Sequence, residues 1–288
     1  MARRYTLACV SACVVGVVTI RPLQAQSFRT VATSRLIAAD ESLFVNVEFA
    51  AGTLLLAPGD GRSLYRGELY YDEDKFAPVT TFDAKTGRLN FGLTRADEKS
   101  FNLGHIESPQ QLTLRIAPQV PSRIEVVLGA TEAEIELGGL SLSRADINSG
   151  AAKANLSFSR PNRIRCDRLT LKTGAAQFHA TGLGNSRCRE VSFAGGVGDV
   201  LLDFTGEWNE GSVRQANINL GFGQLTIRLP RGLGVAVDVD RFLASFDRAG
   251  LAKVGSDYQS PDYASAKHKL DITIKAVLGD IVIEWVEQ

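Results

Sequence analysis

The sequence predicts an all-β protein, built as a single-chain right-handed β-solenoid-like stack of coils of about 21–25 residues with an N-terminal β capping unit. Two observations predict this class. Little of the chain has the apolar spacing of a helix, whereas alternating runs bounded by turn residues recur, such as 43–49, 112–116 and 269–274. A glycine-led pattern also returns at nearly constant spacing, which is typical of repeat architectures.

Residues 1–25 are expected to form a signal peptide. Arg3 and Arg4 precede an apolar run over residues 7–20, and this run is shorter than the about 20 residues that a membrane-spanning helix needs. The small residue Ala25 ends a segment that resembles a cleavage site. We therefore expect an exported chain that starts near residue 26, has no transmembrane span, and resides in the periplasm or at the cell surface.

Two alternatives for this leader stay open. Residues 10–12 followed by Cys13 resemble a lipobox, which would place a lipid on that cysteine. The apolar run could also remain as an uncleaved anchor.

The remainder divides into two predicted units. Residues 26–110 carry longer strands and a charged turn at 71–75, and we interpret them as a separate or capping β unit. Residues 111–288 carry the repeat and form the predicted solenoid domain.

The repeat begins at glycines spaced by 21, 24, 22 and 25 residues, namely Gly129, Gly150, Gly174, Gly196 and Gly221. The fourth, sixth and eighth residues after each glycine form apolar columns that we expect to point inward. These are Ala133, Ala154, Phe178, Val200 and Leu225; Ile135, Leu156, Ala180, Leu202 and Ile227; and Leu137, Phe158, Gly182, Phe204 and Leu229. The residues between them are mostly polar and are expected to be exposed: Glu132, Lys153, Gln177, Asp199 and Gln224, then Glu134, Asn155, His179, Leu201 and Thr226.

A second short strand follows in most repeats, at 168–171, 190–193 and 216–220. Two short strands per repeat make one coil, and coils stack at the strand spacing of about 4.8 Å. One coil cannot bury its own apolar face, whereas several stacked coils can.

A long excursion over residues 243–267 interrupts the repeat. Insertions in solenoids often emerge on a face that makes contacts. Tyr258 and Tyr263 are therefore candidate contact residues. The alternative is that these tyrosines fold back and cap the end of the stack.

The strand patterns resemble those of a known bacterial family. The segments AAGTLLL at 50–56, GQLTIRLPRGLGVAVDVD at 223–240 and LGDIVIE at 278–284, with the glycine-led strands between them, are similar to the toast-rack family, which includes the C-terminal region of LiaF-like envelope-stress proteins and adhesin-like proteins. The resemblance covers about residues 35–288. It implies an extracytoplasmic β-solenoid without established enzymatic residues.

Composition argues against several functions. The 32 basic and 32 acidic residues give a formal charge of zero, so no global field steers the chain toward nucleic acid, and a polyanion-binding role is disfavoured. The three histidines, His105, His179 and His268, have no metalloprotease spacing, and we expect no metal and no cofactor. No nucleophile elbow of the GxSxG type occurs.

An exported solenoid could also be a carbohydrate-active enzyme, which would need carboxylates that converge on a groove. Glu132, Glu134 and Glu136 gather on one strand, but alternation predicts a solvated face for them. The sequence favours an exported, non-enzymatic envelope protein, an adhesin-like or structural binding module that acts through a solenoid face. The alternatives are an accessory regulator of the envelope-stress response and, third, a carbohydrate-active enzyme. Partners stay open between envelope proteins and polysaccharide.

Cys166 and Cys188 are predicted to form a disulfide. Each cysteine lies three residues before one inward apolar position and five before the next, so the two occupy the same place on consecutive coils. Equivalent Cα atoms of stacked coils lie about 4.8 Å apart, within the range that a disulfide tolerates. Two buried free thiols are the alternative.

Overall fold

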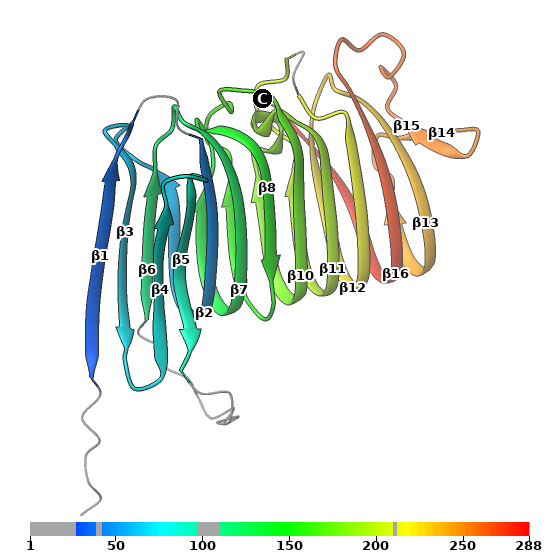
Figure 1. Ribbon diagram of the computed structural model, residues 1–288. Coiled ribbons are helices and arrows are strands. Elements are labelled where there is room, and N and C mark those ends of the chain that lie inside the picture. Colours follow the sequence, from blue (N-terminus) through cyan, green and yellow to red (C-terminus); the bar gives the residue numbers. More distant parts are fainter. Residues whose placement is uncertain (1–26, 39–41, 97–109, 210–211, 288) are drawn as a thin grey trace, which may run out of the picture.

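The computed structural model describes residues 27–38, 42–96, 110–209 and 212–287. The predicted signal peptide, Cys13 and His105 lie outside these residues. The described chain is all-β, as predicted, and its strands form one sheet of 16 strands (Figure 1). In chain order, the strands and one short 3₁₀ helix are β1 (Phe28–Leu36), β2 (Leu43–Pro58), β3 (Ser63–Asp72), β4 (Phe76–Asp83), β5 (Arg88–Arg95), β6 (Gln111–Ile116), β7 (Pro121–Glu136), β8 (Ser141–Ser149), β9 (Lys153–Ser157), β10 (Cys166–Thr181), η1 (Leu183–Ser186), β11 (Cys188–Asp203), β12 (Gln215–Pro230), β13 (Gly234–Asp247), β14 (Ala252–Val254), β15 (Asp257–Gln259) and β16 (Lys269–Val286).

The repeats pair in parallel and in register. β10 pairs with β11, β11 with β12, and β12 with β16, so that equivalent positions of successive repeats lie side by side. The predicted inward columns are confirmed, because every member except the half-buried Gly182 is buried. The polar column that starts at Glu132 is exposed as predicted. Thr226 was expected to be exposed and is buried, because its neighbours Leu201 and Val282 flank it and Gln224 donates to its hydroxyl.

The two short strands expected in each repeat are one continuous strand of 16 residues in β10, β11 and β12. Each of these strands bends near its middle, so that its two ends lie at the same edge of the molecule (Figure 1). The glycines make the bend possible. Gly223 has a φ of 135°, and a Cβ there would lie 1.9 Å from the carbonyl oxygen of Gly198 on the adjacent strand.

The N-terminal strands join the same sheet through β2. Its residues pair in parallel with β7 over most of its length, and with β5 and β6 on the other side. Outward from β6 lie β3 and then β1, each antiparallel to the strand before it, and β4 pairs antiparallel with β5. The turn between β3 and β4 is closed by Lys75, whose amide donates to Asp72. A unit boundary near residue 110 stays a prediction.

The C-terminal end departs from chain order. The last strand, β16, lies between β12 and β13, with β13 parallel to it on the outside. β15 and β14 then extend the sheet in antiparallel fashion. A regular solenoid of consecutive coils therefore does not describe this end, and the right-handed stack stays a prediction for the rest.

Candidate functional site

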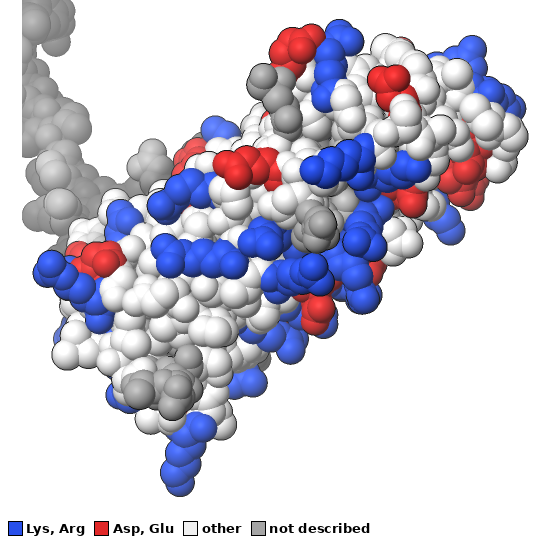
Figure 2. Space-filling model, turned by 90° about the horizontal axis from the view of Figure 1, so that it is seen from above, with Lys and Arg blue, Asp and Glu red and all other residues white. Residues whose placement is uncertain are grey.

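The ends of the long strands and the loops between them bring many arginines to one edge. The segments 159–168, 182–190 and 205–214 hold seven arginines and four acidic residues, and no lysine. Figure 2 shows Lys and Arg side chains gathered over the middle of the molecule when it is seen from this side. We call this surface the arginine edge and define it by Arg160, Arg163, Arg165, Arg187, Arg189 and Arg214.

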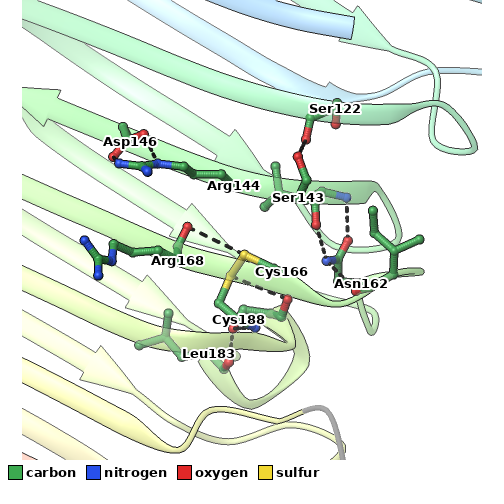
Figure 3. The surroundings of a disulfide bond; sticks show 12 residues. Ser122, Ser143, Arg144, Asp146, Asn162, Cys166, Arg168, Leu183 and Cys188 are labelled. Atoms are coloured by element: carbon green, nitrogen blue, oxygen red, sulfur yellow. Dashed lines mark hydrogen bonds and ion pairs between the residues drawn. A yellow bond between two sulfur atoms is a disulfide. The ribbon is translucent and has the colours of Figure 1, made fainter. Parts of the chain in front are cut away.

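A disulfide links two of the loops that carry these arginines (Figure 3). Cys166 begins β10 and Cys188 begins β11, and their Cα atoms lie 4.0 Å apart. The amide of Cys166 donates to the carbonyl of Arg187 at 3.0 Å. Arg165 and Arg187, each just before a cysteine, are thereby fixed on neighbouring turns.

Buried asparagines hold the same turns together. The side chain of Asn162 accepts from the amide of Leu142 and donates to its carbonyl, both at 2.8 Å, as a neighbouring strand would (Figure 3). Asn185 does the same between later turns, donating to the carbonyl of Phe158 and accepting from the amide of Glu207. These contacts let irregular loops stack without unpaired backbone groups.

The arginines of the edge differ in what they contact. Arg163 donates to the carbonyl of Gly139, and Arg187 to that of Asn162, so both support the loops. The exposed side chains of Arg165, Arg189 and Arg214 make no hydrogen bond or ion pair within the described residues. In the same part of the chain, the buried Nε of Arg187 also lacks a partner. The exposed guanidinium groups of Arg165, Arg189 and Arg214 are free to bind an anion.

Ion pairs lie beside this edge on β8 and its neighbours. Arg144 binds both carboxylate oxygens of Asp146, at 2.8 and 3.2 Å (Figure 3). Arg123 approaches the same carboxylate within 3.9 Å. Burial raises the pKa of Asp146, but hydrogen bonds from Arg144 and Thr170 outweigh it and leave this pKa below its ordinary value. Asp146 therefore stays ionised and neutralises part of the local positive charge.

The three glutamates on β7 are bonded to the next strand. Lys153 pairs with Glu132 at 3.3 Å, Asn155 donates to Glu134 at 2.6 Å, and the hydroxyl of Ser157 donates to Glu136 at 2.9 Å. They lie on separate rungs of a flat strand pair. This arrangement provides no acid and base facing each other across a groove.

No group of three or more metal-ligating side chains comes together in the residues that the structure describes. His179 lies half-buried on β10, and His268 lies half-buried just before β16. The structure does not bring these two histidines into a site.

Tyr258 and Tyr263 both contact the chain itself. The ring of Tyr258 on β15 packs edge-on against Phe246 with centroids 5.1 Å apart. The hydroxyl of Tyr263 donates to Asp271 at 2.8 Å, and this bond raises the pKa of the tyrosine. The ammonium of Lys269 lies 4.9 Å from the same ring. These contacts favour the capping alternative, while a contact role for the two tyrosines stays a prediction.

The fold and the site together define a class: a repetitive, mainly parallel β-protein whose distinctive surface is a charged loop edge. Residues 23–177 match the family model of the N-terminal domain of toast_rack (DUF2154). Residues 180–283 match that of the C-terminal domain of LiaF, described as cell wall-active antibiotics response. The chain belongs to the toast-rack family, as the strand patterns predicted.

Solved structures with a similar course of the chain share little sequence. A "putative cell adhesion protein" from Clostridium sporogenes is 17% identical, with a TM-score of 0.46, and the match covers 90% of this chain and 100% of that one. A "putative adhesin" from Bacteroides fragilis is 11% identical, with a TM-score of 0.40 and coverage of 90% and 98%. No curated protein matches the chain.

Across the described ranges, none of the helical structure has the length and apolar character that a membrane span requires.

Proposed function

We propose that the chain is an exported, non-enzymatic binding module of the bacterial envelope, and that the arginine edge holds an anionic envelope polysaccharide. The observation that carries this is the set of exposed guanidinium groups, on Arg165, Arg189 and Arg214, that have no partner among the residues the structure describes. Guanidinium groups bind carboxylates and phosphates in bidentate fashion. Arg189 and Arg214 lie side by side on neighbouring turns, where the amide of Arg214 donates to the carbonyl of Arg189 at 3.1 Å, and Arg165 lies on the turn before them.

The proposal includes the wider organisation of the chain. Residues 1–25 direct export, residues 26–110 cap the stack, and residues 111–288 form a right-handed β-solenoid-like domain. The family match to a cell wall-active antibiotics response protein supports a place in the envelope. The disulfide supports an oxidising compartment, where such bonds persist.

Binding to defined polymers tests the proposal. Polygalacturonate and poly(glycerol phosphate) serve as anionic probes, and dextran as the neutral probe. We expect the full chain to bind the anionic polymers only, with an affinity that falls as salt rises. The triple variant Arg165→Gln, Arg189→Gln, Arg214→Gln should bind about tenfold more weakly, because three exposed contacts of about 0.5 kcal/mol each are lost.

A matched control removes the same charge elsewhere. Arg62→Gln, Arg66→Gln and Arg115→Gln change exposed arginines of the N-terminal strands and should leave the affinity unchanged. If the wild-type chain binds no anionic polymer, or if both triple variants weaken binding equally, the arginine edge is not the site.

The non-enzymatic part has its own test. The chain is incubated with a panel of acidic and neutral glycans, and new reducing ends are measured. We expect none above the blank. Turnover of any glycan would contradict a pure binding role.

A second candidate function is an accessory role in the envelope-stress response. The match of residues 180–283 to the LiaF C-terminal domain favours it. Cross-linking in envelope fractions separates the two candidates. One membrane or kinase-type partner would favour regulation, whereas recovery of polysaccharide with no dominant protein would favour the binding module.

A further inference from the structure

The strand bends on the edge opposite the loops leave large apolar side chains in water. Phe242 is 78% exposed, Leu243 63%, Val277 57%, and Val197 and Phe222 50% each. We call these five residues the bend ridge. Most of the exposed large hydrophobic side chains of the described residues belong to it. Exposed apolar surface concentrated in this way marks an interaction site rather than an ordinary surface.

The bend ridge is continuous across four neighbouring strands. Val197 on β11 pairs with Phe222 on β12, Phe222 pairs with Leu278 on β16, and Leu278 pairs with Leu243 on β13. The bends themselves are convex outward (Figure 1), and the five ridge side chains are exposed there. A convex apolar edge can enter a deformable lipid surface, whereas a folded partner would need a matching concave groove.

An open groove with a volume of about 650 Å³ runs beside the ridge. Its lining includes five alanines and glycines, the ridge residues Phe242 and Val277, and the two lysines Lys172 and Lys275. Neither ammonium group takes part in an ion pair within the described residues. The groove also contains Asp240 opposite Lys275, and Thr173, whose buried hydroxyl has no partner in the described structure.

We infer that the bend ridge docks on a lipid surface that carries anionic headgroups, with Lys172 and Lys275 facing the headgroup phosphates. Apolar side chains flanked by lysines are typical of elements that lie in the membrane interface. Asp199 and Asp280 lie on the side of the ridge away from the groove. Charge therefore contributes only modestly to the binding free energy, and insertion of the apolar side chains dominates it. Docking by the bends leaves the arginine edge pointing away from the lipid, but the inference does not depend on that edge.

Quenching by brominated phospholipids tests the insertion directly. Phe222→Trp places a reporter on the ridge at a site that is 50% exposed, and Leu36→Trp places one on β1 at a site that is 74% exposed. Both variants keep the two native tryptophans as a common background. We expect brominated vesicles to quench the Phe222→Trp variant measurably more than the Leu36→Trp variant. Equal quenching, or stronger quenching of the Leu36→Trp variant, would overturn the inference, because neither result places the bend ridge in the lipid.

Variants of the ridge and of the lysines separate the two contributions. Phe222→Ser with Phe242→Ser should bind vesicles at least fivefold more weakly than the full chain with Leu36→Ser, which is the control for loss of an exposed apolar side chain. Lys172→Gln with Lys275→Gln should abolish an about threefold preference for vesicles with phosphatidylglycerol over pure phosphatidylcholine. Lys253→Gln, an exposed lysine on β14, is the control. Circular dichroism confirms that each variant folds.

Two further results would refute lipid docking. Sedimentation velocity without lipid could show a dimer that Phe222→Ser with Phe242→Ser dissociates, in which case a second copy covers the ridge. The ridge variants could also bind vesicles as strongly as the wild-type chain. The polymer-binding assay is performed without lipid, so the failure of either proposal is seen separately.

Discussion

At the residue scale, Asp146 shows how charge stabilises the start of the repeats. Its carboxylate is only 16% exposed, accepts two hydrogen bonds from Arg144 and lies near Arg123. The folded protein lowers the pKa of Asp146. The stabilisation is therefore present above the unfolded pKa of 3.8 and is lost as the pH falls through the folded value.

Asp146→Asn should lower the free energy of unfolding by about 1–2 kcal/mol at pH 7. Near pH 2 the variant and the wild-type chain should be almost equally stable. Urea unfolding at several pH values measures this, with Asp199→Asn on the opposite, exposed column as the control. A loss of stability that is the same at pH 2 and pH 7 would mean that shape, and not charge, is responsible.

Gly223 shows a second residue-scale requirement, the close approach of backbones at the bends. Gly223→Ala should cost about 3 kcal/mol or more, because the new methyl group would lie 1.9 Å from the Gly198 oxygen and φ is 135°. Gly255→Ala is the matched control, since φ is 63° there with nothing within 4 Å of a Cβ, and it should cost about 1 kcal/mol. Thermal unfolding compares the two. Equal losses of stability in the two variants would show that the positive φ alone, and not the close approach of the Gly198 oxygen, makes glycine necessary at position 223.

At the element scale, the disulfide joins β10 and β11 where both begin. It closes a loop of 22 residues, for which the chain-entropy model gives about 3 kcal/mol. Reduction should therefore lower the unfolding temperature of the wild-type chain, and Cys166→Ala with Cys188→Ala should unfold at that lower temperature with or without reductant. Two free thiols per denatured, unreduced chain would contradict the bond.

The cysteine pairing and the inward columns were predictable because both follow from the repeat. Alternation after each glycine assigns Val200, Leu225 and their equivalents to one face, and the same alignment places the cysteines side by side. The continuous bent strands were not predicted. A glycine in a strand pattern indicates either a turn or a bend, and only packing against the neighbouring bend decides between them.

Across the whole molecule, net charge was a poor guide to the candidate site. A formal charge of zero means no global field and disfavoured a polyanion-binding role, yet the loops gather arginines at one edge, while the acidic Glu132, Glu134 and Glu136 lie on a different strand face. The signal was present in the sequence as arginines that recur around the cysteines. Composition averages over the surface and therefore hides such a separation.

The position of β16 between β12 and β13 was also not predictable from the sequence. Gly279 of β16 stacks on Gly223 of β12. The alternating pattern of β16 fits beside β12 as well as the pattern of β13 would, although β13 is the strand that follows β12 in the chain. Pairing patterns of this kind fit any neighbour with a glycine at the same position, so they do not specify strand order. Because of the order β12-β16-β13, removal of β16 should affect two strands rather than one.

In a simple stack, a C-terminal truncation removes only the outermost coil. Here β16 pairs with β12 over its whole length on one side and with β13 on the other. A chain that ends at residue 268 should therefore lose the partner of both strands and leave the apolar faces of Leu225 and Val237 without cover. We expect it to lack a cooperative urea transition and to be cut rapidly by protease between residues 215 and 268.

The N-terminal edge provides the control for this truncation. β1 pairs with β3 alone, and its side chains are exposed or half-buried, so a chain that begins at residue 43 should retain a cooperative transition at somewhat lower urea. Unfolding curves and limited proteolysis compare the two truncated chains. If the chain ending at residue 268 unfolds as cooperatively as the one beginning at 43, β16 is an addition to a stack that is stable without it. Loss of the transition only at the C-terminal truncation would mean that β16 completes the sheet, because β13 has no parallel partner among the described strands until β16 is in place.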